Sequence, residues 1–180
     1  TDTYLTFQEE QIHFITANYM TLFRKKCLQM MQNQIPKNHM DIPWHQFTGS
    51  DKSLPITQTG LTEKASVIGR TGLMMLSCGT GAWRVRSSMN SLATLLGVTC
   101  TADIGLMSIE YTCFDGTDCY SQSLCLTNTG VNTSKLNRLE RFVNDFDHEC
   151  CTMSGEQIHT YLDQIEQIHG LYSPFALGCA

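Results

Sequence analysis

Residues 98–126 read VTCTADIGLMSIEYTCFDGTDCYSQSLCL, and this stretch decides the fold class because apolar residues recur in it at every second position. Such alternation predicts half-buried strands, in which successive side chains point to opposite faces. The residues expected on the buried faces are Val98, Cys100, Ala102 and Ile104 in a first strand, Met107, Ile109 and Tyr111 in a second, and Tyr120, Gln122, Leu124 and Leu126 in a third. The stretch therefore predicts an antiparallel sheet of about three strands.

The second and third strands are separated by Asp115-Gly116, a strong signal for a hairpin turn. A loop with an even number of residues, either Asp115-Gly116 alone or Asp115 through Asp118, keeps the apolar faces of both strands on one side of the sheet. The same register places Cys113 and Cys119 on opposite faces. We therefore expect no disulfide between these two cysteines.

Two helices are predicted before the sheet. Leu61-Thr62-Glu63 marks the start of the first one, with Thr62 as its N-cap. Gly69 and Gly72 inside this helix each cost about 1 kcal/mol relative to alanine, which indicates close approach by another helix. In the second helix Thr80 is expected to be the cap, and a glycine ends each of the two.

Two further helices are predicted after the sheet. Asn132 or Thr133 caps the first of them. The second begins with a capping box made by Ser154 and Gln157. With these elements the fold class is α+β, in which helices pack on a small antiparallel sheet.

The sequence before these elements is of a different kind. Residues 1–34 show apolar residues at three- and four-residue steps, which predicts an N-terminal amphipathic helix. Residues 35–60 hold three of the four prolines and are expected to be a polar tether. We take residues 61–175 as the main soluble domain, and 176–180 as the start of a membrane region that the sequence does not include.

Composition excludes several classes of protein. The 180 residues are 42% hydrophobic and 16% charged, which is typical of one globular domain. A net charge of -5 and a pI near 5.6 argue against nucleic acid as a partner. No apolar run reaches the roughly 20 residues of a membrane-spanning helix, so the chain is expected to be soluble. Its nine cysteines are an odd number without a repeated spacing, which favours a reducing, cytosolic compartment.

Patterns typical of catalysis or of metal binding are weak. His148-Glu149-Cys150-Cys151, even with His159 or His169, matches no zinc spacing, and an ordinary helix end is the simpler interpretation. The sequence has no GxSxG motif for a nucleophilic serine. We therefore assign no catalytic residue, no metal ligand and no cofactor.

One segment, Gly79-Thr80-Gly81-Ala82-Trp83-Arg84-Val85-Arg86, has the residues of an anion site. Free backbone N–H groups at a helix start, together with guanidinium groups and an aromatic ring, could hold a carboxylate. Thr80 and Arg84 are the candidate substrate-binding residues. The alternative is a corner between two helices, with Trp83 in the core and Arg84 paired with an acid.

The chain resembles the soluble N-terminal domain of the threonine/serine exporter family. The residues that carry the resemblance are Gly69-Arg70, Gly79 through Val85, Ser88-Met89-Asn90, Leu96-Gly97-Val98, Gly130 through Leu136 and Tyr172-Ser173-Pro174. The similarity covers roughly residues 62–175. Many members carry an acidic residue where this chain has Arg86, and residues 1–60 have no recognised counterpart.

The resemblance implies a role in transport. In that family a bundle of transmembrane helices follows the soluble domain, and the whole protein exports small amino acids or related metabolites. We expect a domain at the cytoplasmic face of the cell membrane that binds, gates or assembles rather than catalyses. Its expected partners are its own or a separately encoded transmembrane subunit and a small amino acid or carboxylate.

Two other functions stay open at this point. One is a hydrolase-like cytosolic enzyme domain. The other is a purely structural dimerisation module, in which the apolar stripe from Ile12 to Met31 forms the interface of a homo-oligomer.

Overall fold

A computed structural model of the protein describes residues 42–49 and 52–168. The elements in order are two short 3-10 helices, η2 (Trp44–Phe47) and η3 (Ile56–Gln58), helices α2 (Leu61–Ser77) and α3 (Ala82–Leu95), strands β1 (Thr99–Ile104), β2 (Ser108–Phe114) and β3 (Cys119–Cys125), and helices α4 (Thr133–Asn144), α5 (Phe146–Glu149) and α6 (Gly155–Glu166). This is the predicted α+β fold. The predicted helix at 1–34, with its stripe from Ile12 to Met31, and residues 176–180 lie outside the described residues.

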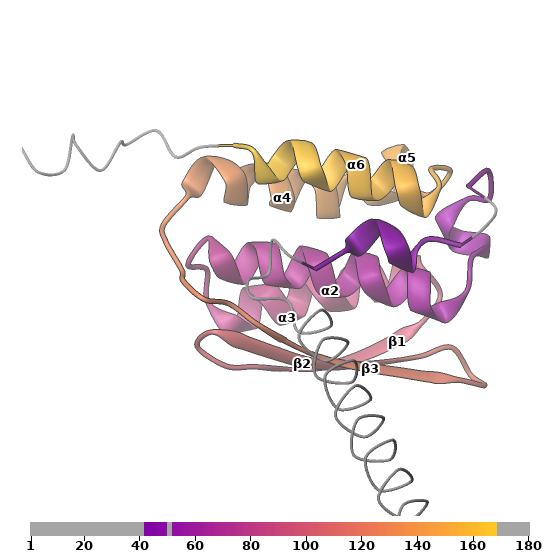
Figure 1. Ribbon diagram of the computed structural model, residues 1–180, viewed down its shortest axis with the longest axis horizontal. Coiled ribbons are helices and arrows are strands. Elements are labelled where there is room, and N and C mark those ends of the chain that lie inside the picture. The colour runs from indigo at the N-terminus through magenta and orange to yellow at the C-terminus, as the bar shows by residue number, and fades with distance from the viewer. Residues whose placement is uncertain (1–41, 50–51, 169–180) are drawn as a thin grey trace, which may run out of the picture. The chain divides into compact units, whose positions relative to one another are not determined.

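The elements form three layers (Figure 1). The sheet makes one outer layer, α2 and α3 cover one of its faces, and α4, α5 and α6 lie on the other side of these two helices. Helix α2 is therefore surrounded, and its residues from Ala65 to Leu76 are all buried. A helix that is apolar on all sides belongs in the interior, and α2 is the centre of the core.

The sheet has the predicted register. Its order is β1-β2-β3, both pairs are antiparallel, and Ile109 lies opposite Ile104 on one side and Leu124 on the other. The hairpin loop runs from Asp115 to Asp118, because Phe114 pairs with Cys119. This is one of the two even-numbered loops predicted, and the Asp115 carboxylate closes it by accepting from the N–H groups of residues 117 and 118.

The same register determines whether Cys113 and Cys119 can form a disulfide. Cys113 is buried on the helix side of the sheet, whereas Cys119 is exposed on the outer side, and both are free thiols. The predicted absence of a disulfide between them is confirmed.

Two of the predicted helix starts are confirmed and two are wrong. The Asn132 side chain caps α4 by accepting from the Lys135 N–H, and Ser154 forms the predicted capping box of α6. The N-caps of α2 and α3 are instead Gly60 and Gly81, and neither has a side-chain cap. Each helix starts at an apolar residue that packs on the core, so Thr62 lies inside the first turn of α2, and Thr80 precedes the cap of α3.

The two glycines of α2 face different neighbours. A Cβ at Gly72 would overlap Met89 of α3, so the predicted close approach of a second helix is confirmed there. A Cβ at Gly69 would overlap the ring of Tyr111, which belongs to β2. At Gly69 the close neighbour is therefore the sheet rather than a helix.

The described part of the expected tether is packed on the core. Ile42, Trp44 and Ile56 are buried, and the backbone N–H of Ile56 donates to the Met153 carbonyl at 2.8 Å. Burial of these apolar side chains offsets the loss of conformational entropy when the segment becomes ordered. The polar tether expected at residues 35–60 is thus packed against the core where it is described, and this segment supplies one wall of the site below.

Candidate functional site

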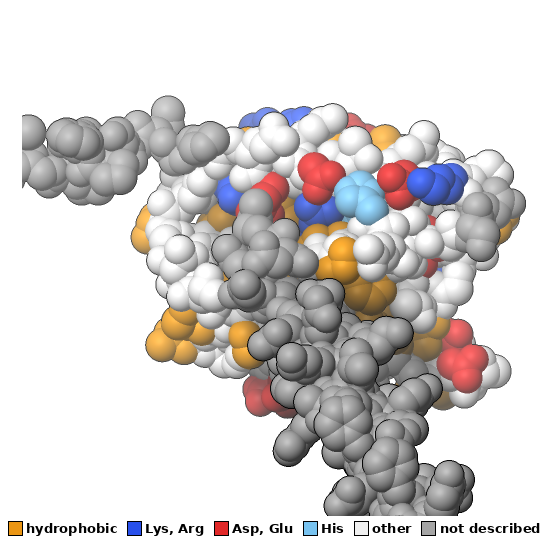
Figure 2. Space-filling model, in the orientation of Figure 1, with side chains coloured by type: hydrophobic (Ala, Val, Ile, Leu, Met, Phe, Trp, Pro, Cys, Tyr) orange, Lys and Arg blue, Asp and Glu red, His pale blue; other side chains and the backbone are white. Residues whose placement is uncertain are grey.

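A polar groove lies where η2 passes over α2 and α6. Its cavity volume is about 460 Å³. Its lining residues come from these three elements and their flanks: Ile42, Pro43, Trp44, His45, Gln46, Arg70, Leu73, Met74, Asp163, Glu166 and Gln167. Figure 2 shows acidic and basic side chains gathered around a histidine on this side of the molecule.

His45 bridges two carboxylates at the mouth of the groove. Its Nδ1 lies 3.1 Å from a Glu156 oxygen, and its Nε2 lies 2.8 Å from an Asp163 oxygen. Desolvation alone would raise the pKa of Glu156, but His45, Thr48 and Lys52 outweigh it and hold that pKa below its ordinary value. The cluster therefore keeps its carboxylates ionised.

Arg70 lies below this bridge and is only 4% exposed. One terminal nitrogen donates to the His159 carbonyl at 3.0 Å, and the other donates to the Asp163 carboxylate. The guanidinium carbon also lies 5.9 Å from the centre of the Trp44 ring. The Nε atom of Arg70 is buried and has no hydrogen-bond partner among the described residues.

Asp163 is the link between the buried and the exposed part of the groove. Desolvation alone would raise the pKa of its carboxyl, but hydrogen bonds from Arg70 and His45 outweigh it and lower that pKa. Its side chain keeps 43% of its surface exposed. An ionised, oriented and accessible carboxylate can accept hydrogen bonds from an ammonium or a hydroxyl group.

His159 is fully buried beneath these residues and is neutral. Burial is the main cause that lowers its pKa to about 3, and the charge of Arg70 adds to it. The Nδ1 atom faces a terminal nitrogen of Arg70 at 3.4 Å, and since arginine only donates, Nδ1 is the acceptor. The single N–H of the neutral ring is therefore on Nε2.

This tautomer determines whether the Ser66 hydroxyl donates to His159 or accepts from it, because Ser66 Oγ lies 3.0 Å from His159 Nε2. The ring donates to the hydroxyl, and the hydroxyl donates to the Glu63 carbonyl at 2.7 Å. In a catalytic serine–histidine pair the ring nitrogen must accept the hydroxyl proton instead. The Ser66–His159 pair is therefore not arranged as a nucleophile with its base, and it orients Arg70.

Glu63 completes the support of the groove. Its buried carboxylate accepts the backbone N–H of Gly49 at 2.9 Å. It also lies against Gly155, where a Cβ would overlap it. Glu63 thus occupies the first turn of α2 and contacts the first residue of α6, where the positive ends of two helix dipoles favour a carboxylate.

The sequence-predicted pair lies elsewhere and is not brought into one cavity. Thr80 lines a hollow of about 500 Å³ at the start of α3, together with neighbours that include Leu106 and Thr129. Arg84 instead pairs with Glu140 at 3.3 Å and lies 5.4 Å from the centre of the Trp83 ring. The alternative interpretation predicted that Arg84 pairs with an acid and that Trp83 lies in the core. Arg84 does pair with an acid, but Trp83 is exposed.

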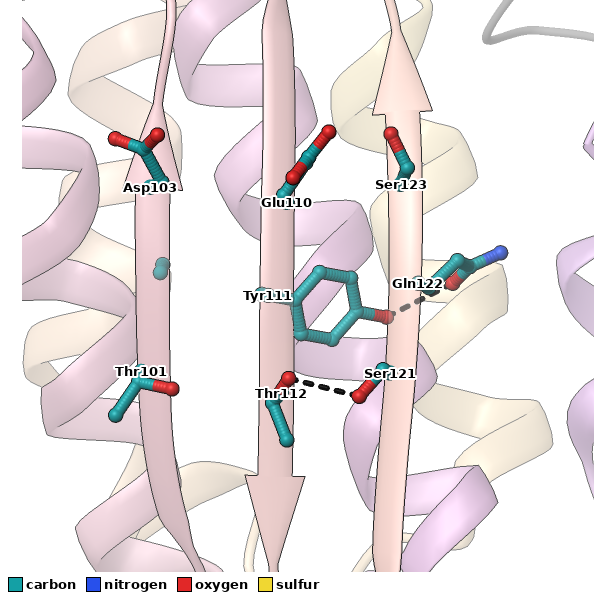
Figure 3. Close-up of a pocket in the computed structure, with 9 residues that line it drawn as sticks. Thr101, Asp103, Glu110, Tyr111, Thr112, Ser121, Gln122 and Ser123 are labelled. Carbon is teal, nitrogen blue, oxygen red and sulfur yellow. Dashed lines mark hydrogen bonds between the residues drawn. The ribbon is translucent and has the colours of Figure 1, made fainter.

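A third hollow, of about 600 Å³, lies on the face of the sheet that points away from α2 and α3 (Figure 3). Figure 3 shows two rows of polar side chains across the strands, Asp103, Glu110 and Ser123 in one and Thr101, Thr112 and Ser121 in the other. Asp103 lies directly opposite Glu110, and two acids in such a cross-strand pair repel each other. We assign no ligand to this face.

Metal binding finds little support in the part of the chain that the structure describes. No group of three or more His, Cys, Asp or Glu side chains there could hold a metal ion. In the His148–Cys151 segment, burial raises the pKa of the Cys150 thiol to about 11, which disfavours the thiolate that a metal requires.

The comparison with protein families bears on the helices that build the groove. A family described as "Putative threonine/serine exporter" matches residues 66–180. The chain belongs to this exporter family. No curated protein and no solved structure matches it.

The family match includes Arg70, His159 and Asp163, and it also includes Thr80 and Arg84. Membership relates the chain to transport of threonine and serine. None of the helices within residues 42–49 and 52–168 is both long and apolar enough to cross a membrane.

Sequence reasoning gave Arg70 no site role, and it weighed His159 only as a possible zinc ligand. The signal that was available is a charged residue inside an otherwise apolar helix, between Ile68 and Leu73. In the last helix, His159 follows the buried Ile158 and precedes Asp163 by one turn.

Proposed function

We propose that this chain is part of a transporter that exports threonine, serine or related small metabolites, and that the described residues are its soluble portion at the cytoplasmic face. In this role the portion binds the solute and gates its passage rather than transforming it. Family membership supports the transport role. The polar outer face of the sheet supports contact with water.

The observation that carries the binding role is the position of Asp163. Its carboxylate is held by Arg70 from the interior and by His45 from the other side of the groove. Because two partners orient it and part of it is still accessible, it needs little reorganisation to accept an α-ammonium group. The hydroxyl of threonine or serine finds further polar groups in Gln46 and Gln167 on the same lining.

Thr80 and Arg84 remain the second candidate contact. The start of α3 has no side-chain cap, so its first N–H groups are available to a carboxylate. Arg84 is exposed and its pairing with Glu140 is solvent-accessible, so it can exchange partners at low cost.

Ligand-dependent thermal unfolding of the chain tests the proposal and separates the two places. Threonine and serine are added to the original chain and to the variants Asp163→Asn and Arg84→Gln, with dicarboxylates as the comparison ligands. At one hundred times the dissociation constant a bound ligand stabilises by about 2.7 kcal/mol, which is a readily measured shift in Tm. We expect threonine to stabilise the original chain and Arg84→Gln, but not Asp163→Asn.

Loss of the shift in Arg84→Gln alone would move the site to the start of α3. Absence of a shift for every ligand would contradict the binding role. Transport is tested separately, by threonine efflux from cells that make the whole transporter. There Asp163→Asn should lower efflux, whereas Glu140→Gln, which removes an exposed carboxylate, should not.

The partners follow from the same proposal. The exporter needs a transmembrane portion, either in the same polypeptide or as a separately encoded subunit, and assembly as a homo-oligomer is compatible with it. A hydrolase-like activity is the competing function, and the Ser66–His159 geometry argues against the most obvious nucleophile. A fluorophosphonate probe should therefore leave Ser66 unmodified, as read by peptide mass spectrometry.

A further inference from the structure

Three large apolar side chains of the described residues stand out into solvent far more than any others. Trp83 is 69% exposed, Leu106 is 89% exposed and Val131 is 85% exposed. They come from the start of α3, from the loop between β1 and β2, and from the segment that leads into α4. A single exposed apolar residue is ordinary, but three at one place indicate an interaction surface.

These three residues surround the loop Gly79–Gly81. A Cβ at Gly79 would lie 3.7 Å from Val131 Cγ2, and one at Gly81 would lie 3.4 Å from Trp83 Cδ1. Leu106 and the glycine loop line the same hollow. We call Trp83, Leu106 and Val131 the apolar corner.

The apolar corner is also where the described chain ends. The side-chain amide of Asn132, next to Val131, donates to the carbonyl of Ile168 at 2.9 Å. Figure 1 shows the last turn of α6 and the start of α4 at the same end of the molecule as the loop between β1 and β2. The described chain therefore ends next to these exposed side chains, and the family match continues to residue 180.

We propose that the apolar corner docks on the surface of a phospholipid bilayer, with its three side chains inserted at the boundary between headgroups and acyl chains. The inference rests on the proposed function, because the soluble portion of a membrane transporter is held next to lipid. Side chains that protrude from three separate elements suit a deformable apolar phase better than a shaped protein pocket. An indole is also favoured at that boundary, since it is apolar over most of its surface and carries one donor.

The charges around the apolar corner are compatible with lipid phosphates. Arg84 lies over the Trp83 ring and its side chain is 47% exposed, so it can reach a phosphate while the indole is inserted. Its present partner Glu140 is exposed too, and such a pair is readily exchanged. On the neighbouring helix start, Lys135 neutralises Glu166 at 3.1 Å.

Vesicle binding by the whole chain tests the docking. The vesicles contain phosphatidylcholine and phosphatidylglycerol, and partitioning is measured by flotation. We expect the double variant Leu106→Ser, Val131→Ser to partition about tenfold less, because each side chain loses its apolar burial in the bilayer. The matched control is Leu54→Ser, Phe114→Ser, which removes two exposed apolar side chains away from the apolar corner and should partition like the original chain.

Tryptophan fluorescence supplies a second readout. The chain has two tryptophans, of which Trp44 is buried and Trp83 is exposed. Emission should therefore move to shorter wavelength when vesicles are added, and Trp83→Phe should abolish that shift.

Three results would overturn the docking proposal: no binding of the original chain to vesicles, equal partitioning of the corner and control variants, or shielding of Trp83 by concentration-dependent self-association without vesicles. The last result would identify a second copy as the occupant. Threonine binding is measured without vesicles, so a failed docking test leaves the proposed function standing, and a failed binding test is seen independently.

Discussion

The ring of Tyr111 lies directly on the backbone of Gly69, and its hydroxyl donates to the Ala65 carbonyl one turn earlier at 3.0 Å. The contact joins the central strand to the central helix. The tyrosine hydroxyl is buried, and without this hydrogen bond an unpaired polar group would destabilise the core. The missing side chain at residue 69 is therefore a structural requirement.

This contact predicts the effect of Gly69→Ala. An added Cβ would overlap the Tyr111 ring, so we expect the free energy of unfolding to fall by about 2 kcal/mol, although alanine favours the helix. The control is Gly60→Ala, where a Cβ meets nothing within 4 Å. Urea denaturation measures both variants, and equal stabilities for the two would contradict the packing argument.

The buried His159 predicts a dependence of stability on pH. The unfolded chain takes up a proton at this histidine below pH about 6.5, whereas in the folded protein burial lowers the pKa to about 3. Stability contributed by the neutral ring is therefore present above pH 6.5 and is lost as the pH falls through 3, by about 5 kcal/mol in total. The lowered pKa values of Glu156 and Asp163 add to the loss at the acidic end.

Unfolding free energies measured across this pH range check the prediction. The slope should become shallower in His159→Gln, and it should stay in His148→Gln, which changes an exposed histidine. A stability that does not vary between pH 6.5 and pH 4 would show that His159 takes up its proton in the folded protein.

The two arginine–carboxylate pairs predict different energetic effects. Asp163→Asn leaves the buried Arg70 without its charged partner, and we expect a loss of about 2 kcal/mol, moderated because water reaches the Asp163 side. Glu140→Gln breaks the exposed pair with Arg84 and should cost less than about 1 kcal/mol. Chemical denaturation at neutral pH compares the two, and the reverse order would contradict the burial argument.

Thiol reactivity follows from the sheet register. Cys119 and Cys125 are exposed on the face of the sheet that points away from α2 and α3, and they should react with a maleimide within minutes in the folded protein. Cys113 should stay protected, since its hydrogen bond with Cys100 and its burial both raise its pKa. Peptide mapping by mass spectrometry reads each site, and fast labelling of Cys113 would mean that the sheet register is different.

Much of the fold could be predicted because its signals are local. Alternation in residues 98–126 fixes the strands, and the even-numbered loop at Asp115 fixes which faces meet. The side-chain cap at Asn132 and the capping box at Ser154 could also be identified from neighbouring residues alone. Thr62 and Thr80 were misassigned because a threonine near a helix start is a signal even when a glycine next to it provides the cap.

The groove could not be predicted in the same way, because its residues are far apart in the sequence. His45 and Asp163 are separated by 118 positions and meet only because Trp44 packs against the core. Proline spacing in residues 35–60 predicted a tether or loop, but it gave no information on what the apolar residues between the prolines contact. At the start of α3, Thr80 and Arg84 are only four positions apart in the sequence, yet they face different surroundings.

The hydrogen bond from the Asn132 side-chain amide to the Ile168 carbonyl joins the start of α4 to the segment that follows α6. A force applied at residue 168 would act on α6 and, through the Asn132 amide, on the first turn of α4. Helix α6 carries Asp163 and His159, which both accept hydrogen bonds from Arg70, so a force on α6 would also act on these two residues. In the proposed transporter, a membrane-embedded portion that pulled on this end of α6 would therefore act on the groove through the covalent backbone.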